Sequence, residues 1–338
     1  MKYSKARARA SYCNLQTCAS VWACPLCSAK ISEHRRADLV KLVAAHRAAG
    51  GTVLLVTRTF PHYRTDRLPD LLAGLKVAED KYRQGAPWQR LKKRFGIEGT
   101  VRAIECTYGS NGWHPHIHEL VFIAPQSDTA ARTGALGGPQ AQAVPDDLRA
   151  ALYTRWSSAC LRAGLPLPSE EHGVDVRDGT YAAQYAAKWG IESELTKWHV
   201  KHGKAESVTP FDFLRIALQS EDAAAIAAAR ALFAEYAAAF KGRRQLVYSP
   251  GLRDLYDLDP EVSDEEAAAG EEPDAELLGH LEPQHWKAIL QAGMRGQLLE
   301  AINAAGGAWD AIDEVLGEAM AKYSPPPVDG SPGPDCPF

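Results

Sequence analysis

Three histidines alternate with other residues in the stretch GWHPHIHELVF, residues 112–122. Side chains of a β-strand point to its two faces in turn, so His114, His116 and His118 would lie on one face. Imidazole is a common ligand of divalent metal ions, and the apolar residues after the histidines favour a buried strand. Pro115 cannot donate to a strand ladder, which makes His114 the weakest candidate ligand. The stretch predicts a metal site, and a histidine-rich strand without a ligand is the alternative.

A carboxylate for the same site is expected on the preceding strand. Residues 99–124 predict two strands joined by a Gly-Ser-Asn-Gly turn. If the turn centres on Ser110 and Asn111, Glu105 lies directly opposite His116, and paired residues share a face. Two imidazoles and one carboxylate with open positions would suit Mg²⁺ or Mn²⁺ that also binds a substrate oxygen. A shift of the register by one residue would remove Glu105 from the site.

A second metal site is predicted near the start of the chain. Four of the seven cysteines are spaced C-x4-C-x5-C-x2-C, at Cys13, Cys18, Cys24 and Cys27. The short Cys24-Pro-Leu-Cys27 segment lets two thiolates hold one Zn²⁺ ion tetrahedrally. Cys18 and Cys13 would complete the site, with His34 as a substitute for Cys13. Reduced free thiols or a redox-active pair are the alternatives to this structural zinc.

Two tyrosines and a lysine share one face of a predicted helix in the stretch TYAAQYAAKWG, residues 180–190. Tyr181 and Tyr185 are four residues apart and Lys188 follows three residues later, the spacing of neighbours on a helix surface. A phenol can attack a phosphodiester, and an ammonium group can stabilise the charge that develops. A tyrosine pair at this spacing also fits core packing, so the stretch by itself leaves both interpretations open.

The surrounding pattern predicts an α+β fold. Apolar and β-branched runs indicate strands, and periodicity near 3.6 residues indicates helices. Strands are expected at 52–60, twice within 99–124, and at 172–178; helices are expected near 32–49, 66–84, 87–95, 146–163, 179–189 and over most of 206–244. The predicted organisation is a cysteine-rich zinc-binding element at 1–36, a main domain at 37–205, a helical extension at 206–250, an acidic helical region at 251–322 and a disordered tail at 323–338.

Composition and charge narrow the class of protein. The chain has 338 residues, 46% of them hydrophobic, which is enough for a sizeable core. No apolar run approaches the roughly 18 residues of a membrane span, and no secretory signal is recognised, so a cytoplasmic protein without a membrane partner is expected. Residues 1–249 hold 34 basic and 23 acidic residues, whereas residues 250–338 hold 4 and 19. The basic part would suit a polyanionic partner such as DNA.

Taken together, these segments resemble the three motifs of HUH endonucleases. TVLLVTRTF, WHPHIHELVF and YAAQYAAKW occur in the order and approximate spacing of those motifs. More narrowly, TCASVWACPLCSAKI, RAIECTYGSNGWHPHIH and YAAKWGIESELTK are similar to rolling-circle replication initiators (Rep proteins) of small bacterial plasmids. The resemblance covers about residues 15–250. It implies a central antiparallel sheet of the HUH type flanked by helices, with His116 and His118 binding Mg²⁺ or Mn²⁺ and Glu105 as third ligand.

The resemblance also implies roles for the tyrosine helix. Tyr185 would be the nucleophile that forms a 5′-phosphotyrosine, and Lys188 would assist it. Many plasmid initiators have a glutamate four positions before the nucleophile, where this chain has Tyr181. That departure is similar to the two-tyrosine initiators of single-stranded-DNA phages and to some transposases. The implied partners are single-stranded or extruded origin DNA, a host helicase and a host DNA polymerase.

Three other functions fit parts of the same pattern. A two-tyrosine transposase or a mobilisation relaxase would use the same chemistry on different DNA. A zinc-containing DNA-binding regulator would need no cleavage, and a generic metal hydrolase would not become attached to DNA. The chain contains no GxxxxGK[ST] motif for a helicase and no HExxH motif of a zinc protease.

Overall fold

A computed structural model describes residues 1–13, 16–125, 146–178, 207–270 and 274–323. The chain forms two compact units. The larger unit comprises residues 18–268, and the smaller unit joins residues 1–17 with residues 269–338. The domain borders predicted from the sequence remain predictions.

The larger unit is built on an antiparallel sheet of five described strands, in the order β6-β3-β5-β4-β7. The strands are β3 (Thr52–Arg58), β4 (Ile97–Gly109), β5 (Gly112–Ile123), β6 (Val174–Asp178) and β7 (Leu246–Tyr248). Each neighbouring pair is antiparallel. Successive residues of β3 are buried, as expected for a strand covered on both faces. The predicted α+β class with a central antiparallel sheet is therefore observed.

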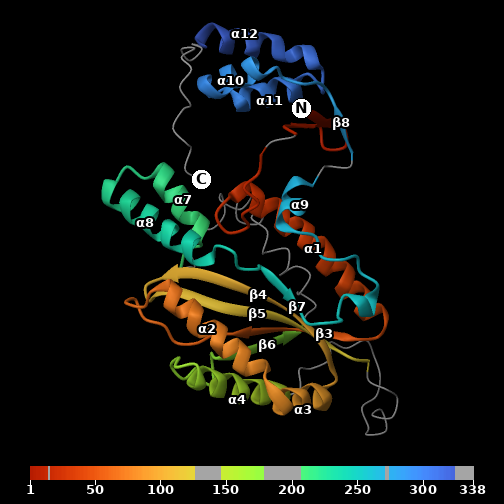
Figure 1. The fold of residues 1–338 in the computed structure, drawn as a ribbon, viewed down its shortest axis with the longest axis vertical. Helices are drawn as coiled ribbons and strands as arrows, with labels where there is room; N and C mark the ends of the chain where they lie inside the picture. Colours follow the sequence, from red (N-terminus) through yellow and green to blue (C-terminus); the bar gives the residue numbers. More distant parts are fainter. Residues whose placement is uncertain (14–15, 126–145, 179–206, 271–273, 324–338) are drawn as a thin grey trace, which may run out of the picture. The chain divides into compact units, whose positions relative to one another are not determined.

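Helices cover both faces of this sheet (Figure 1). On one face, α1 (Pro25–Ala48) packs Leu39 and Leu42 against Leu55 and Phe122 of the sheet. On the other face lie α2 (Leu68–Arg83), α3 (Gly85–Phe95) and α4 (Asp146–Arg162). The sequence pattern placed the first of these helices at residues 32–49, but α1 begins seven residues earlier. Pro25 at its first turn is favourable there because it has no N–H to leave unpaired.

A helical hairpin follows in the same unit. α7 (Pro210–Gln219) starts with a capping box in which Thr209 and Asp212 satisfy each other's backbone N–H groups. α8 (Ala223–Phe240) packs Phe240 against Trp22 at 4.6 Å between ring centroids. Contrary to the expectation from the sequence, α8 is long and apolar enough to cross a membrane by length and composition alone.

Short elements complete the two units. The larger unit continues through a 3₁₀ turn, η3 (Asp254–Tyr256), to α9 (Asp264–Ala269). The smaller unit has a sheet in the order β2-β1-β8, and its apolar core includes Tyr3, Ile289 and Leu298. Its elements are β1 (Lys2–Ser4), β2 (Arg9–Ser11), β8 (Ala275–Leu277), α10 (Pro283–Ala292), α11 (Arg295–Ala304), η4 (Trp309–Ile312) and α12 (Asp313–Lys322).

Candidate metal centre

The hairpin of β4 and β5 brings the predicted metal ligands together. Glu105 pairs with His116, and Ala103 pairs with His118. This is the register expected for a turn centred on Ser110 and Asn111, so that prediction is confirmed. The only irregularity of the β4–β5 ladder lies between Ile97 and Gly99, at the end far from the turn. It does not change the pairing of His116 or His118.

Glu105, His116 and His118 converge on one point, with one ligand atom of each within 4.8 Å of the others. His118 Nε2 lies 2.8 Å from Glu105 Oε2, and His116 Nε2 lies 3.6 Å from the same oxygen. Both histidines are buried, whereas the Glu105 side chain is 38% exposed. A small divalent ion held here would therefore have two nitrogen ligands, one oxygen ligand and an open side toward solvent.

Hydrogen bonds at Nδ1 fix the orientation of both imidazole rings. His116 Nδ1 lies 3.1 Å from the His114 carbonyl oxygen, to which only a protonated nitrogen can donate. His118 Nδ1 lies 3.0 Å from Thr57 Oγ1 on β3, its direct neighbour across the ladder. Metal-binding histidines are usually fixed in this way through the ring nitrogen that does not bind the metal. The two Nε2 atoms, 3.1 Å apart, then face each other and a carboxylate, an arrangement that a cation would stabilise.

Glu105 is held in its ionised form at this site. Burial by itself raises the pKa of Glu105, but the hydrogen bonds and charges of His116 and His118 hold it well below its usual value. Burial, together with the neighbouring His116 and His62, lowers the pKa of His114 to about 3. His114 is therefore neutral at neutral pH, and it is not one of the three converging ligands.

Thr57→Val is expected to weaken Mn²⁺ binding by roughly 10- to 100-fold, the usual effect of losing an outer-shell partner of a metal ligand. Valine has the shape of threonine but cannot hydrogen-bond to His118 Nδ1. Isothermal titration with Mn²⁺ measures the change. Thr59→Val is the matched control, because the Thr59 hydroxyl donates instead to the His172 carbonyl oxygen, at 2.9 Å. Equal affinities for the two variants would contradict the role assigned to Thr57.

The cysteine cluster is the second possible metal site. Cys18, Cys24 and Cys27 each place a sulfur within 4.8 Å of the others, and the Sγ atoms of Cys18 and Cys27 are 3.7 Å apart. Burial raises the pKa of Cys24, but hydrogen bonds from the backbone N–H groups of Cys27 and Leu26 and from the neighbouring thiols lower it overall. A lowered pKa favours the metal-binding thiolate form at Cys24, whereas burial and the neighbouring thiols raise the pKa of Cys27 to about 11.

The identity of the metal as zinc and its fourth ligand both remain predictions. Among the described residues, the converging group contains neither Cys13 nor His34. Cys13 belongs to the smaller unit, whereas the other three cysteines belong to the larger one.

Cys27→Ser is expected to remove zinc from the purified protein, because serine keeps the shape of the side chain but is a poor zinc ligand at neutral pH. Metal analysis of protein purified without chelators gives the zinc content directly. Cys160→Ser is the control, since Cys160 is equally buried but lies outside the cluster. Zinc retained by the Cys27 variant would rule out a ligand role.

The tyrosine helix cannot be compared with this geometry. Tyr181, Tyr185 and Lys188 lie outside the described residues, and their roles remain predictions.

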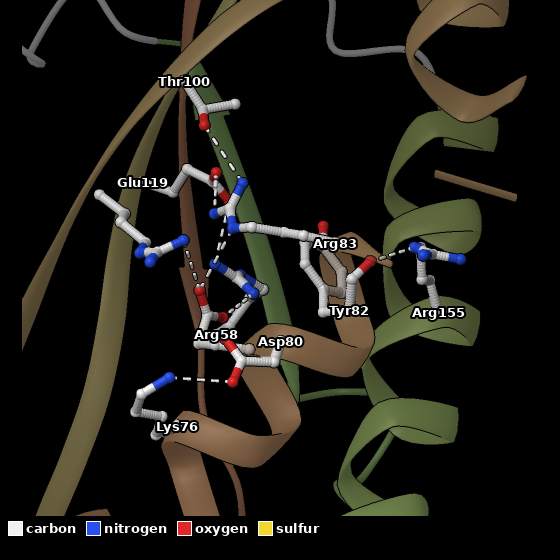
Figure 2. Close-up of polar contacts among 10 residues, drawn as sticks. Arg58, Lys76, Asp80, Tyr82, Arg83, Thr100, Glu119 and Arg155 are labelled. Carbon is white, nitrogen blue, oxygen red and sulfur yellow. Dashed lines mark hydrogen bonds and ion pairs between the residues drawn. The ribbon is translucent and has the colours of Figure 1, made fainter. Parts of the chain in front are cut away.

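A buried cluster of charges on the other face of the sheet was missed by sequence reasoning. Arg58 and Glu119 follow Thr57 and His118 in their strands, so they face α2 (Figure 2). Arg58 is fully buried, and it makes ion pairs with Glu79 and, at 3.0 Å, with Glu119. The signal in the sequence is an arginine and a glutamate placed within otherwise apolar strands.

Further contacts hold this cluster in place. Arg83 makes an ion pair with Glu119 and a 3.2 Å hydrogen bond with Thr100 (Figure 2). The Arg58 guanidinium also lies over the Tyr82 ring, 4.1 Å from its centroid. Burial lowers the pKa of Arg58, but the carboxylates of Glu79 and Glu119 raise it above its ordinary value. The strand that carries His118 is thus joined to α2 by paired charges.

The chain is similar in sequence to known proteins of Streptomyces. The chain is 30% identical to "Protein rep" of Streptomyces lividans over an alignment of 295 residues, and the match covers 72% of this chain. The chain is therefore a distant homologue of that protein. The alignment spans 64% of the relative's own length, less than two thirds of it.

A second relative matches a shorter part. A "Neomycin resistance protein" of Streptomyces cyanogenus is 30% identical over an alignment of 139 residues, and the match covers 34% of this chain and 32% of that protein. No protein-family model and no solved structure matches the chain.

Proposed function

We propose that this protein initiates rolling-circle replication of a plasmid by cutting and rejoining one DNA strand. The observation that carries the proposal is the convergence of Glu105, His116 and His118 on one face of an antiparallel sheet. The distant homology to "Protein rep" supports a role in replication. The resemblance to HUH endonucleases supplies the type of reaction.

In the proposed reaction, the Tyr185 oxygen attacks the phosphorus of the scissile phosphodiester in line with the bond to the 3′ oxygen. That bond breaks, leaving a 5′-phosphotyrosine and a 3′ oxygen that takes up a proton and becomes the primer for a host polymerase. A bound Mg²⁺ or Mn²⁺ would supply polarisation of the phosphate oxygens. Lys188 assists by stabilising charge at the tyrosine and the phosphate.

The closing step uses the same chemistry in reverse. Transesterification conserves the phosphodiester energy in the adduct, so rejoining needs no ATP. We assign Tyr181 to the second transfer: its oxygen attacks the phosphodiester at the copied origin and frees a new 3′-OH. That 3′-OH attacks the Tyr185 phosphotyrosine, which rejoins the displaced strand and releases the Tyr185 oxygen. Single-stranded or extruded origin DNA is the substrate, and unwinding is left to a host helicase in the cytoplasm.

One of the other functions, the non-catalytic regulator, has specific support in the structure. A transposase or relaxase shares all the proposed chemistry and differs in its DNA; the homology to "Protein rep" favours replication. A non-catalytic regulator is supported by the cysteine cluster, which would stabilise a DNA-binding surface without any adduct.

An adduct assay tests the proposal. Labelled single-stranded origin DNA and Mn²⁺ are incubated with wild type, Tyr185→Phe, Tyr181→Phe and the double variant, and the products are separated on a denaturing gel. A protein–DNA adduct that disappears with Tyr185→Phe alone makes Tyr185 the initiating nucleophile. An adduct that survives each single change but not the double makes the tyrosines interchangeable. Absence of an adduct in every lane would refute nicking and favour the regulator.

A further inference from the structure

The loop of residues 61–66, between β3 and α2, is fixed against the tip of the β4–β5 hairpin. The Tyr63 N–H donates to Asp66 Oδ2 at 2.8 Å, and the Asp66 N–H donates to the Tyr63 carbonyl oxygen at 2.9 Å. Gly112 at the hairpin turn has a φ of +84°, and a Cβ there would lie 3.0 Å from the Arg64 Cα. Only glycine fits this close approach without strain. The loop is therefore a defined surface.

Stacked imidazole rings connect this loop to the metal centre. His62 of the loop stacks on His114, with 4.6 Å between ring centroids and 14° between ring planes. His114 in turn stacks on His116, one of the three converging ligands, at 4.7 Å and 30°. The His114 ring therefore lies between His62 of the loop and His116 of the predicted metal site.

The outer side of the loop combines an aromatic ring with positive charge. Tyr63 is 60% exposed, which leaves its side chain open to a ligand from solvent. Arg64 and Arg67 are also exposed. Neither arginine has an ion pair among the residues that the structure describes.

We propose that the 61–66 loop is a contact surface for single-stranded DNA beside the metal centre. Tyr63 stacks on a nucleobase, and Arg64 contacts a backbone phosphate. Proteins hold single strands through this combination of aromatic stacking and basic side chains, which tolerates any base because each one has a flat face. The inference rests on the proposed function: a strand whose scissile phosphate lies at Glu105, His116 and His118 has its adjacent nucleotides within reach of the loop.

Binding of a labelled single-stranded oligonucleotide to the full-length protein tests this proposal. Fluorescence anisotropy without added Mg²⁺ or Mn²⁺ measures affinity without any cutting and leaves the predicted zinc site undisturbed. Tyr63→Ala is expected to weaken binding by roughly 5- to 150-fold, the range for the loss of one stacked base. Tyr63→Phe keeps the ring and is expected to bind within about threefold of wild type. Arg64→Ala is expected to lower the salt dependence of binding by about 0.7 in log–log slope, the value for one lost phosphate contact.

Leu161→Ala is the matched control for Tyr63→Ala, because Leu161 on α4 is similarly exposed, at 58%. Equal affinities of wild type and Tyr63→Ala would overturn the inference. So would equal weakening by the Leu161 and Tyr63 variants.

The adduct assay separates this result from the proposed function. If wild type forms an adduct and Tyr63→Ala binds the oligonucleotide as tightly as wild type, the loop inference is refuted and the proposed function stands. If wild type forms no adduct while Tyr63→Ala still weakens binding, nicking fails and the DNA surface stands.

Discussion

His118→Ala is expected to lower the affinity for Mn²⁺ by more than about 100-fold and to abolish the DNA adduct. His118 supplies the nitrogen nearest to Glu105, at 2.8 Å. Loss of an outer-shell partner alone costs about 10- to 100-fold, so loss of a direct ligand costs more. Titration with Mn²⁺, followed by electron paramagnetic resonance of the free ion, measures the affinity. The adduct assay at saturating DNA gives the second readout.

The control is His172→Ala, because the His172 side chain is 77% exposed and is not part of the triad. Alanine at the buried position 118 also leaves a cavity, so Glu105→Gln serves as a second variant of unchanged shape. It removes the negative charge and is expected to weaken Mn²⁺ binding without lowering the unfolding temperature. Unchanged Mn²⁺ affinity in both variants would show that the triad is not the metal site.

Arg58→Met is expected to lower the free energy of unfolding by about 3–5 kcal/mol, the usual cost of removing one partner from a buried ion pair. Methionine fills similar space but leaves Glu79 and Glu119, both buried, without the guanidinium between them. Denaturation in urea, followed by tryptophan fluorescence, measures the change. Trp156 is a suitable reporter because its ring lies 5.0 Å from the Arg58 guanidinium.

Arg94→Met is the control for this prediction. Arg94 makes an exposed ion pair with Asp147, with side chains 62% and 57% exposed, and such pairs contribute about 0–1 kcal/mol. The double variant Arg58→Met/Glu119→Gln tests the coupling. It is expected to be less destabilised than the sum of the two single variants, because the second change removes one of the carboxylates left unpaired. Strict additivity, or a loss below about 1 kcal/mol for Arg58→Met, would argue against a coupled cluster.

The histidine site is largely determined by the sequence. The alternation of His116 and His118 places both on one face of any strand, because side chains in a strand repeat every two residues. The Gly-Ser-Asn-Gly turn sets the register that brings Glu105 opposite His116. Both features are local: the triad comes from one hairpin, whose strands are adjacent in the chain, so short-range rules suffice.

Contacts between distant segments were decided only by the tertiary structure. Thr57 contacts His118 because β3 pairs with β5. The local sequence of neither strand determines the register of that pairing. The contact of Arg58 with Glu79 depends on which side of α2 faces the sheet. Likewise, β1 pairs with β8 over about 270 residues of chain, through strands too short to carry a recognisable pattern.

The cysteine cluster is determined partly by the local sequence and partly by the tertiary structure. The spacing of Cys24 and Cys27 indicated that both sulfurs could meet one ion, and the start of α1 at Pro25 holds them together. Whether Cys18 joined them depended on the path of the chain before the helix, which the spacing alone does not fix. In this protein, ligands within one hairpin or one helical turn follow from the sequence. Supporting contacts such as that of Thr57 require the packed fold, because they join segments whose relative positions only the complete core determines.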